Sequence, residues 1–203
     1  MDDRVVIALF RHGVTEENKR KAYLGWNDSP LCPESKTILI SKIYQRYFSS
    51  DLQRCIRTTE TLFPTTTPHL LKELREMNFG TWEGQTYEDL KENSLYRQWL
   101  GDPFSHFPPE GESFHEFSTR VDTGWSKITD EVLKSNLQSC AVITHGGVIR
   151  YFLSKYAPCP KEFWAWQATH DQGYEMIFDR ESLRRGRRCT LLSVVPLTAN
   201  EHG

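Results

Sequence analysis

The sequence lacks the features that define several classes of protein. It contains five cysteines in 203 residues, and no two of them have the CxxC spacing of a redox or zinc site. An odd number of widely spaced cysteines argues against a disulfide framework and a cysteine-rich zinc site, and it predicts a reducing, cytoplasmic location. The formal net charge is −2, so we expect no nucleic-acid partner and no attraction to an anionic membrane.

Long apolar runs, internal repeats, low-complexity tracts and linkers are also missing. The first apolar run covers residues 5–10 and follows two acidic residues, Asp2 and Asp3. This run is too short for a signal peptide or a membrane span. With 38% hydrophobic and 26% charged residues, the chain has the composition of a globular protein. Its length suits a single domain over residues 1–203.

Short apolar runs alternate with segments that begin with helix-capping residues. The apolar runs predict strands at residues 5–10, 47–49, 69–74, 140–144, 174–179 and 190–195. Helices are predicted over residues 50–62, 86–99, 113–134 and 146–155, with a weaker helical pattern over 34–46 and loops at 16–28 and 101–112. Capping boxes begin the first three helices, formed by Ser50 with Gln53, Thr86 with Asp89, and Ser113 with Glu116. This alternation predicts an α/β fold of three layers.

A motif rich in polar groups, Arg11-His12-Gly13, follows the first predicted strand directly. In an open α/β sheet, ligands bind outside the carboxyl ends of the strands. Arg11 offers a planar fork of donors suited to phosphate, and a neutral His12 is a potential nucleophile near pH 7. An ordinary surface arginine and a loop histidine are an equally good interpretation of these residues alone.

A second histidine-glycine step, His145-Gly146, follows the predicted strand 140–144. Two such steps at the ends of buried strands predict that both imidazoles face one crevice. Arg54 lies in the first turn of the predicted helix 50–62, where the helix dipole disfavours a cation unless that cation faces an anion. Two arginines and two histidines around one small anion indicate a phosphate site.

For Arg54 there is a simpler alternative. Arg54 and Arg57 are one helical turn apart, and both can pair with Asp51 or Glu60 on the surface. On the helix alone, this alternative is the better interpretation.

A phosphate-transfer site also needs a general acid. Glu76 follows the predicted strand 69–74 and is placed to reach the crevice. Glu83 is the local rival, but its neighbours Trp82 and Gly84 indicate a structural turn, so we favour Glu76.

Taken together, these motifs resemble those of the histidine phosphatase superfamily, which includes the cofactor-dependent phosphoglycerate mutases. The resemblance covers four stretches in family order: Arg11-His12-Gly13-x-Thr15-x-x-Asn18, Ser49-Ser50-Asp51-Leu52-x-Arg54, Leu74-Arg75-Glu76-x-x-Phe79-Gly80-x-Trp82-Glu83-Gly84 and Thr144-His145-Gly146-Gly147. Pro109-Glu110-Gly111-Glu112-Ser113 and Asp171-Gln172-Gly173 are similar to the smaller phosphatase branch, which includes α-ribazole phosphatases. The resemblance implies a phosphoglycerate mutase-like α/β/α sandwich with a mostly parallel central sheet.

The resemblance also implies a role for each site residue. His12 would attack phosphorus and become phosphorylated, and Glu76 would protonate the leaving oxygen. The remaining implied phosphate-binding residues are Arg11, Asn18, Arg54, His145 and Gly146. Fixed cations would replace the metal that many phosphatases use, so no metal and no cofactor are expected.

The expected function is hydrolysis of a small phosphomonoester by a monomer or homodimer. Three alternatives stay open: a cofactor-dependent phosphoglycerate mutase, a non-catalytic phosphate-binding member of the fold, and a protein phosphatase. In the last of these, Arg184 and Arg185 from the arginine-rich segment 180–188 would dock an acidic peptide. A solvated hairpin turn is the simpler interpretation of that segment.

Four further side chains have two interpretations each. Trp164 and Trp166 would stack on an organic leaving group or, more commonly, pack in the core. His115 and His170 would touch the substrate or lie at the surface.

Overall fold

The central sheet contains six strands in the part of the chain that the computed structural model describes, which is residues 3–33, 40 and 42–197. The strands are β1 (Arg4–Arg11), β2 (Arg46–Ser49), β3 (His69–Leu70), β4 (Ser139–Thr144), β5 (Gln172–Asp179) and β6 (Leu191–Pro196). The α-helices are α1 (Glu16–Arg20), α2 (Gln53–Leu62), α3 (Tyr87–Leu90), α4 (Ser94–Gly101), α5 (Phe114–Lys134), α6 (Gly146–Tyr156) and α7 (Arg180–Arg184). Three short 3-10 helices are η1 (Lys72–Leu74), η2 (Gly80–Trp82) and η3 (Phe163–Ala165). No helix in these described ranges is both long enough and apolar enough to cross a membrane.

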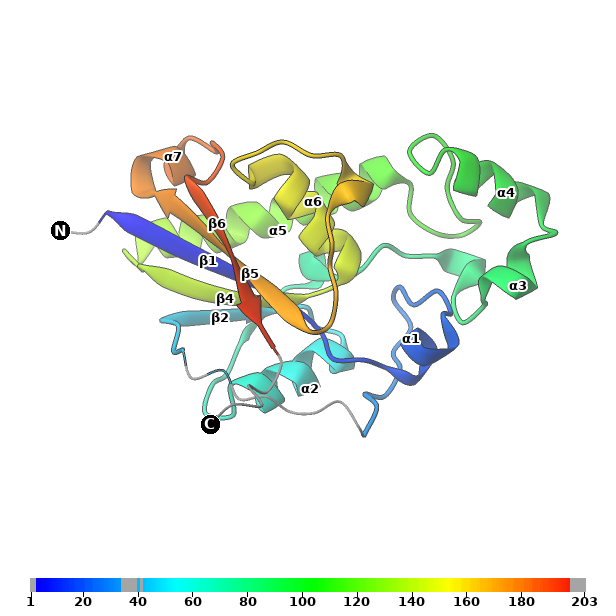
Figure 1. Cartoon of the computed structure of the whole chain (residues 1–203), viewed down its shortest axis with the longest axis horizontal. Helices are drawn as coiled ribbons and strands as arrows, with labels where there is room; N and C mark the ends of the chain where they lie inside the picture. The colour runs from blue at the N-terminus through cyan, green and yellow to red at the C-terminus, as the bar shows by residue number, and fades with distance from the viewer. Residues whose placement is uncertain (1–2, 34–39, 41, 198–203) are drawn as a thin grey trace.

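The strand order is β3-β2-β4-β1-β5-β6, and β1 to β4 are parallel (Figure 1). The strand β5 runs antiparallel to both of its neighbours, β1 and β6, and the predicted, mostly parallel sheet is confirmed. Because β1, β2 and β4 run in one direction, their carboxyl ends meet at one edge. The register places Arg11 beside Thr144 and Ser49 beside Ile143.

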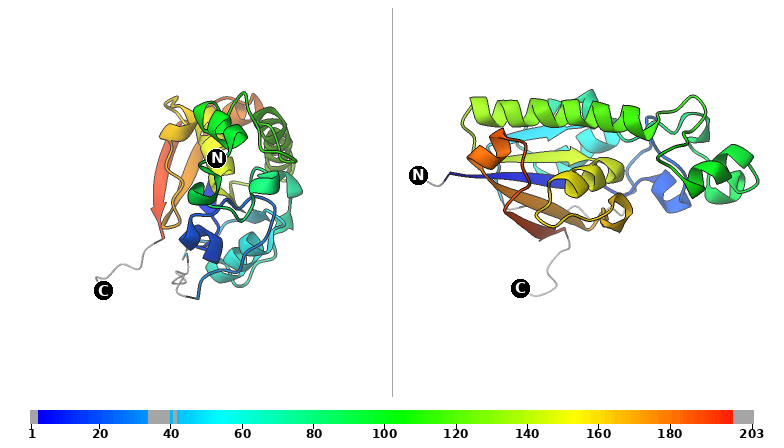
Figure 2. Two further views of the ribbon diagram at one scale, coloured as in Figure 1. Left: turned by 90° about the vertical axis from the view of Figure 1, so that its right-hand side faces the viewer. Right: turned by 90° about the horizontal axis from the view of Figure 1, so that it is seen from above.

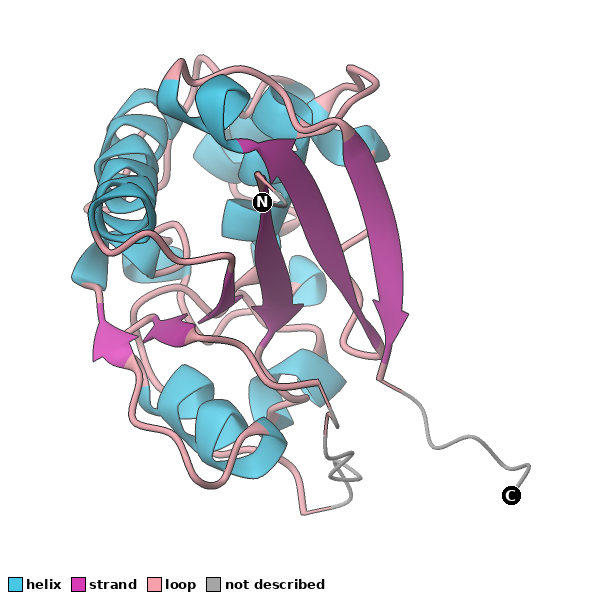
Figure 3. Ribbon diagram, turned by 90° about the vertical axis from the view of Figure 1, so that its left-hand side faces the viewer, coloured by secondary structure: helices cyan, strands magenta, loops and turns pink. Residues whose placement is uncertain are grey.

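Helices cover both faces of the sheet, which confirms the three layers (Figures 2 and 3). Alternating side chains of β1 point to opposite faces. Ile7 and Leu9 belong to the core under α5 and α6, whereas Ala8 and Phe10 belong to the core against α2. A strand that is buried on both faces requires the uninterrupted apolar run seen in residues 5–10.

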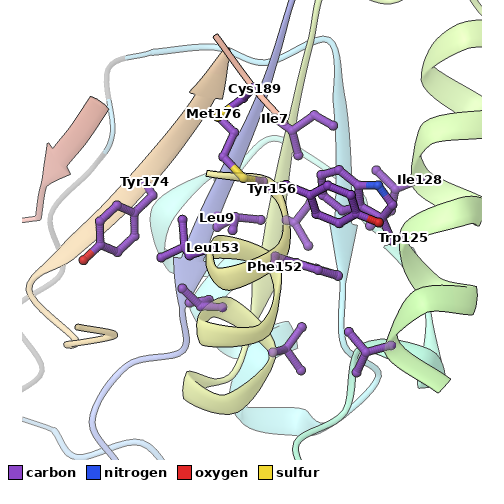
Figure 4. Close-up of a cluster of buried hydrophobic side chains, with 14 of the residues drawn as sticks. Ile7, Leu9, Trp125, Ile128, Phe152, Leu153, Tyr156, Tyr174, Met176 and Cys189 are labelled. Atoms are coloured by element: carbon purple, nitrogen blue, oxygen red, sulfur yellow. The ribbon is translucent and has the colours of Figure 1, made fainter. Parts of the chain in front are cut away.

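The larger core lies between α5, α6 and the sheet, where aromatic side chains fill the layer (Figure 4). The rings of Trp125 and Tyr156 stack with centroids 4.3 Å apart. Burial of each large apolar side chain contributes about 1.5–3 kcal/mol, so this layer holds α6, and with it His145, firmly against the sheet.

A third, smaller core lies beyond the carboxyl ends of the strands, under α3 and α4 (Figure 1). It consists of Trp82, Leu90, Tyr96 and Trp99, with Tyr23 packed against it. This cluster fixes the loop after β1 and the α3–α4 segment as one structure above the strand ends.

Some predicted elements are wrong in extent. The strand expected over residues 69–74 has only the two residues of β3, and the chain then turns into η1. The helix expected over 86–99 is two helices. The first ends at Leu90, and the Oδ1 of Asn93 caps the second by accepting from the N–H groups of Leu95 and Tyr96. The expected loop 16–28 contains α1, which Thr15 caps. In the 34–46 segment, residues 34–39 and 41 lie outside the described residues, and β2 begins at Arg46.

The capping boxes at Thr86 and Ser113 are confirmed, but the one at Ser50 is wrong. The residue before α2 is Leu52, which provides no side-chain cap. The carboxylate of Asp28, from the loop after β1, accepts hydrogen bonds from the N–H groups of Gln53 at 2.8 Å and Arg54 at 3.4 Å. A distant acidic residue therefore provides the favourable anion at this helix N-terminus.

Candidate active site

The carboxyl ends of β1, β2 and β4 bring the predicted histidines together. The N–H of His12 donates to the Thr144 carbonyl oxygen, and the N–H of Ser50 donates to the Ile143 carbonyl oxygen, each at 2.9 Å. These bonds extend the parallel pairing by one residue past each strand. As a result, the ring centroids of His12 and His145 are 5.2 Å apart.

His12 has one ring nitrogen fixed by the backbone. Its Nδ1 lies 2.8 Å from the Gly13 carbonyl oxygen. A carbonyl oxygen only accepts, so Nδ1 carries the proton and the neutral ring keeps its lone pair on Nε2. Burial, reinforced by the nearby Arg54 and Arg11, holds the pKa of His12 well below its ordinary value of 6.5. At neutral pH, Nε2 is therefore an unprotonated nitrogen.

Arg11 lies between His12 and the start of α6. Its Nη1 donates to the Ala168 carbonyl oxygen at 2.6 Å. A Cβ atom on Gly146 would lie 3.3 Å from the Arg11 guanidinium carbon, so a glycine permits this close approach. Burial lowers the pKa of Arg11, and Glu76 opposes that effect. Arg11 therefore remains a cation in a partly desolvated position.

The Arg54 side chain is 0% exposed, so the surface alternative is wrong for this residue. Its guanidinium donates to the carbonyl oxygens of Gly25 and Asn27 and to the carboxylate of Asp28. The loop after β1 thus folds back and holds Arg54 beside the histidines. The surface alternative does hold for Arg57, which pairs with the exposed Glu60 at 2.9 Å.

The Nε atoms of Arg11 and Arg54 are buried and have no hydrogen-bond partner in residues 3–33, 40 and 42–197. A buried donor without an acceptor is costly, and it is costlier when the group is charged. The two guanidinium groups therefore form a site whose donors match the acceptors of a small anion. Across the same described ranges, no three histidine, cysteine, aspartate or glutamate side chains are grouped to hold a metal ion.

His145 caps α6 and is fully buried. Its Nε2 and the Ser50 Oγ are hydrogen-bonded at 2.9 Å, and the Cys55 sulfur lies 3.5 Å from the same nitrogen. Burial, with the charge of Arg54 second, holds the pKa of His145 well below 6.5. A neutral imidazole thus stands opposite His12.

The Glu76 carboxylate reaches the N-terminus of α6. Its Oε2 accepts from the Gly147 N–H and its Oε1 from the Met77 N–H, both at 2.9 Å. The backbone is held as well, because Trp26 Nε1 and Arg120 Nη2 donate to the Glu76 carbonyl oxygen. Both the side chain and the peptide of Glu76 are therefore positioned by other elements.

Glu83, the local rival of Glu76, is a structural residue. Its carboxylate accepts from the N–H groups of Trp26 and Asn27, at 2.6 Å each. These bonds hold the loop that in turn holds Arg54, so the turn interpretation agrees with the structure.

Asn18 lies in α1, within the loop after β1, where it is bonded to Thr15. Its Oδ1 accepts from the Thr15 N–H at 3.2 Å, and its own N–H donates to the Thr15 Oγ1 at 3.2 Å. These bonds form the capping box of α1. Asn18 therefore shapes the loop after β1.

His170 is a site residue that the sequence reasoning did not select. Its Nδ1 donates to the His12 carbonyl oxygen at 2.7 Å, and the two rings are 5.4 Å apart. Burial lowers its pKa from 6.5 to about 4. It precedes β5, whose antiparallel direction brings its first residues to the end of β1, with Gly173 beside Phe10. The nearby Asp171-Gln172-Gly173 stretch was the available signal.

A cavity of about 720 Å³ lies next to Glu76 and Gly147. The other residues that line it are largely apolar: Tyr23, Met77, Phe79, Trp99, Leu100, Gly101, Asp102, Pro103, Phe104, Phe114, Phe117, Arg150, Phe163 and Trp164. Trp164 faces this cavity and is 56% exposed, whereas Trp166 is buried in the main core. Core packing therefore describes Trp166, whereas Trp164 lies where it could contact a leaving group. His115 lies exposed on α5, as a surface histidine.

The arginine-rich segment 180–188 is at the opposite edge of the sheet. It begins with the helix α7, and not with a simple hairpin turn. The Arg180 N–H donates to the Asp3 carbonyl oxygen, beside the first residue of β1. Arg184 and Arg185 both pair with Glu181. A peptide docked on these arginines would lie far from His12.

A family model for the histidine phosphatase superfamily (branch 1) matches residues 7–183, so the chain belongs to this superfamily. An adenosylcobalamin/alpha-ribazole phosphatase from Salmonella typhimurium is 28% identical over 176 residues, which cover 81% of this chain and 85% of that protein. The alpha-ribazole phosphatase structure from Shigella flexneri matches 96% of both chains with a TM-score of 0.80 at 22% identity. A phosphoglycerate mutase structure from Thermus thermophilus is 30% identical, with a TM-score of 0.65 over 93% of this chain and 98% of that chain. The predicted superfamily, its small phosphatase branch and the phosphoglycerate mutase-like fold are confirmed.

Proposed function

We propose that this protein hydrolyses a small-molecule phosphomonoester through a phosphohistidine formed on His12. The observation that carries the proposal is the ring of His12, which is held with Nδ1 protonated and Nε2 unprotonated beside two buried arginines. Nucleophilic catalysis requires an unprotonated nitrogen near its target, and phosphoryl transfer requires fixed positive charge around the equatorial oxygens.

The proposed phosphate site uses residues from three strand ends. Arg11 and Arg54 would donate to the phosphoryl oxygens through donors that include their Nε atoms. His145 and the backbone at Gly146, at the start of the 11-residue helix α6, lie beside His12 and Arg11. A helix N-terminus favours an anion. Asn18, whose Oδ1 is bonded to Thr15, would bring its amide Nδ2 to the same phosphate.

The reaction has two steps. In the first, the Nε2 lone pair of His12 forms a bond to phosphorus while the bond from phosphorus to the ester oxygen breaks, and Glu76 gives its proton to that leaving oxygen. In the second, the Glu76 carboxylate takes a proton from water as the water oxygen attacks phosphorus. The P–N bond then breaks and inorganic phosphate is released.

Two contacts support Glu76 as the proton carrier. Its carboxylate lies at the start of α6, next to the phosphate site, through the bond from Gly147. The same carboxylate lines the apolar cavity, where the leaving group would lie. Glu76 therefore stands between the phosphate and its ester group.

The test is hydrolysis of a generic aryl phosphate in the presence of excess chelator, with acid-quench labelling of the phosphoenzyme. We expect turnover and labelling for the wild type and for His115→Ala, a control at an exposed histidine. His12→Ala should lose both. Turnover that survives in His12→Ala, or that stops when chelator is added, would refute the mechanism.

Two further outcomes would select the alternatives. Interconversion of 3- and 2-phosphoglycerate with a bisphosphoglycerate primer, faster than any hydrolysis, would identify a mutase. Binding of inorganic phosphate without turnover of any ester would identify a non-catalytic member of the fold.

A further inference from the structure

We propose that the cavity beside Glu76 selects phosphomonoesters whose leaving group is a planar aromatic ring system, with Trp164 and Phe104 as the specificity-determining residues. This inference rests on the proposed function, because it assigns the part of the substrate that leaves.

The cavity lies next to the proposed phosphate site. Glu76 and Gly147 line it, and they are bonded to each other through the Gly147 N–H. An ester oxygen placed against the Glu76 carboxylate would direct its organic group into this space. The volume of about 720 Å³ lies in the range of sites that enclose drug-sized ligands, and glycerate would leave much of it unfilled.

Aromatic rings form a continuous wall from one side of the cavity to the other. Phe104 packs edge-on against Phe114 at 4.7 Å, and Phe114 packs edge-on against Phe163 at 5.4 Å. Phe163 in turn meets Trp164 at 4.7 Å. The wall joins the loop after α4 to the loop before β5.

The two ends of this wall are exposed. Phe104 is 50% exposed and Trp164 is 56% exposed. An exposed apolar patch around a cavity marks a binding groove, and aromatic rings gain additional energy from edge-to-face or offset contacts with a second ring. A planar leaving group would cover both side chains.

Two charged residues that line the cavity, Asp102 and Arg150, interact with other groups of the protein. A hydrogen bond with the Ser105 side chain lowers the pKa of Asp102, and its carboxylate also accepts from the N–H groups of Phe104 and Ser105. The Arg150 Nε donates to the Trp166 carbonyl oxygen, and its guanidinium carbon lies 5.7 Å from the Trp164 ring. A leaving group rich in hydroxyls would lose its water partners against largely apolar walls, and this is costly.

The test compares two alkyl esters whose leaving alcohols are of similar acidity, 2-naphthylmethyl phosphate and ethyl phosphate. We expect kcat/KM to be higher for the aromatic ester by about 10- to 100-fold. Trp164→Ala and Phe104→Ala should each reduce this ratio by about 3- to 10-fold. Phe107→Ala is the matched control, since Phe107 is 59% exposed and does not line the cavity; it should keep the wild-type ratio.

Binding of 2-naphthalenemethanol, measured by calorimetry, tests the cavity without catalysis. The wild type and His12→Ala should bind the alcohol, and Trp164→Ala should bind it about 3- to 10-fold more weakly. Binding of this alcohol with no hydrolysis of either ester would refute the proposed function and keep the cavity assignment. Equal kcat/KM for both esters, with phosphoenzyme formed on His12, would refute the inference and keep the proposed function. Faster hydrolysis of a phosphoseryl peptide, whose leaving group is an alcohol without a ring, than of the naphthyl ester would also overturn the inference.

Discussion

Replacing Gly147 by alanine tests how Glu76 is positioned. A Cβ atom at Gly147 would lie 2.2 Å from the Glu76 Oε1 and 3.1 Å from its carboxyl carbon. Such an overlap is impossible, and the group that yields is the end of a flexible side chain. The carboxylate is therefore expected to move out of its present position, while the backbone of α6 stays.

The fold should tolerate this change. Gly147 lies in the first turn of α6, and among the glycines of the described residues only Gly80, Gly84 and Gly186 have positive φ. Alanine in a helix is favoured over glycine by about 1 kcal/mol. We therefore expect the free energy of unfolding to be unchanged or slightly raised in urea denaturation.

Activity should fall according to the leaving group. General acid catalysis contributes about 10²- to 10⁴-fold, which corresponds to about 2.7–5.4 kcal/mol. The Gly147→Ala variant should lose that factor in kcat for an alkyl phosphate, whose alkoxide needs a proton. It should lose much less for a nitrophenyl phosphate, whose leaving group is stable as an anion. Glu76→Gln should show the same pattern.

The reasoning would be refuted by a stable Gly147→Ala variant whose kcat for the alkyl phosphate stays within about threefold of the wild type, because general acid catalysis would then not depend on this position. Equal losses for both esters would also contradict it, since they would indicate a role for Glu76 other than proton donation.

Three further predictions concern groups that position the site. Asp28→Ala removes the acceptor at the N-terminus of α2, and it should lower the free energy of unfolding by about 1–2 kcal/mol in urea. The pKa of His170 is lowered to about 4 in the folded protein, so as pH falls the unfolded chain is protonated at this histidine before the folded one. The contribution of His170 to the free energy of unfolding is therefore complete above about pH 6.5 and is lost as the pH falls toward 4. His170→Asn, whose amide can still donate to the His12 carbonyl oxygen, should reduce that slope by at most about 1.4 kcal/mol per pH unit. Arg120→Lys keeps the charge but loses the planar fork that holds the Glu76 backbone, so kcat should fall about 10-fold with little change in KM.

Each of these predictions has a contradicting result. An Asp28→Ala variant as stable as the wild type would show that water caps α2 equally well. An unchanged pH slope in His170→Asn would mean that His170 titrates normally. A rise in KM without a change in kcat for Arg120→Lys would place Arg120 in substrate binding and not in the support of Glu76.

An unfavourable position of a charged residue in the sequence indicates the site. The first-turn position of Arg54 is unfavourable for a cation, and the structure resolves it by burying the side chain among acceptors from the loop after β1. The sequence favours Glu76 as the general acid because Glu76 follows a predicted strand. That strand has only two residues, yet η1 continues the chain toward the same edge of the sheet.

The sequence by itself determined the two buried strands β1 and β4, the start of α5 and the two histidines at the strand ends. The apolar run before His12, the one before His145 and the capping residue Ser113 act on near neighbours, so their effects are readable along the chain. Parallel strands then place both histidines at one edge, because their carboxyl ends coincide.

Only the tertiary structure decided what surrounds these residues. Asp28 caps a helix 25 residues away, His170 lies just before the antiparallel strand β5, and the cavity takes its walls from segments as distant as Tyr23 and Trp164. Such contacts depend on how layers pack and on which loops fold back, and no local pattern encodes them. The proposed chemistry at phosphorus therefore rests on short motifs, whereas the proposed selection of the leaving group rests on long-range packing.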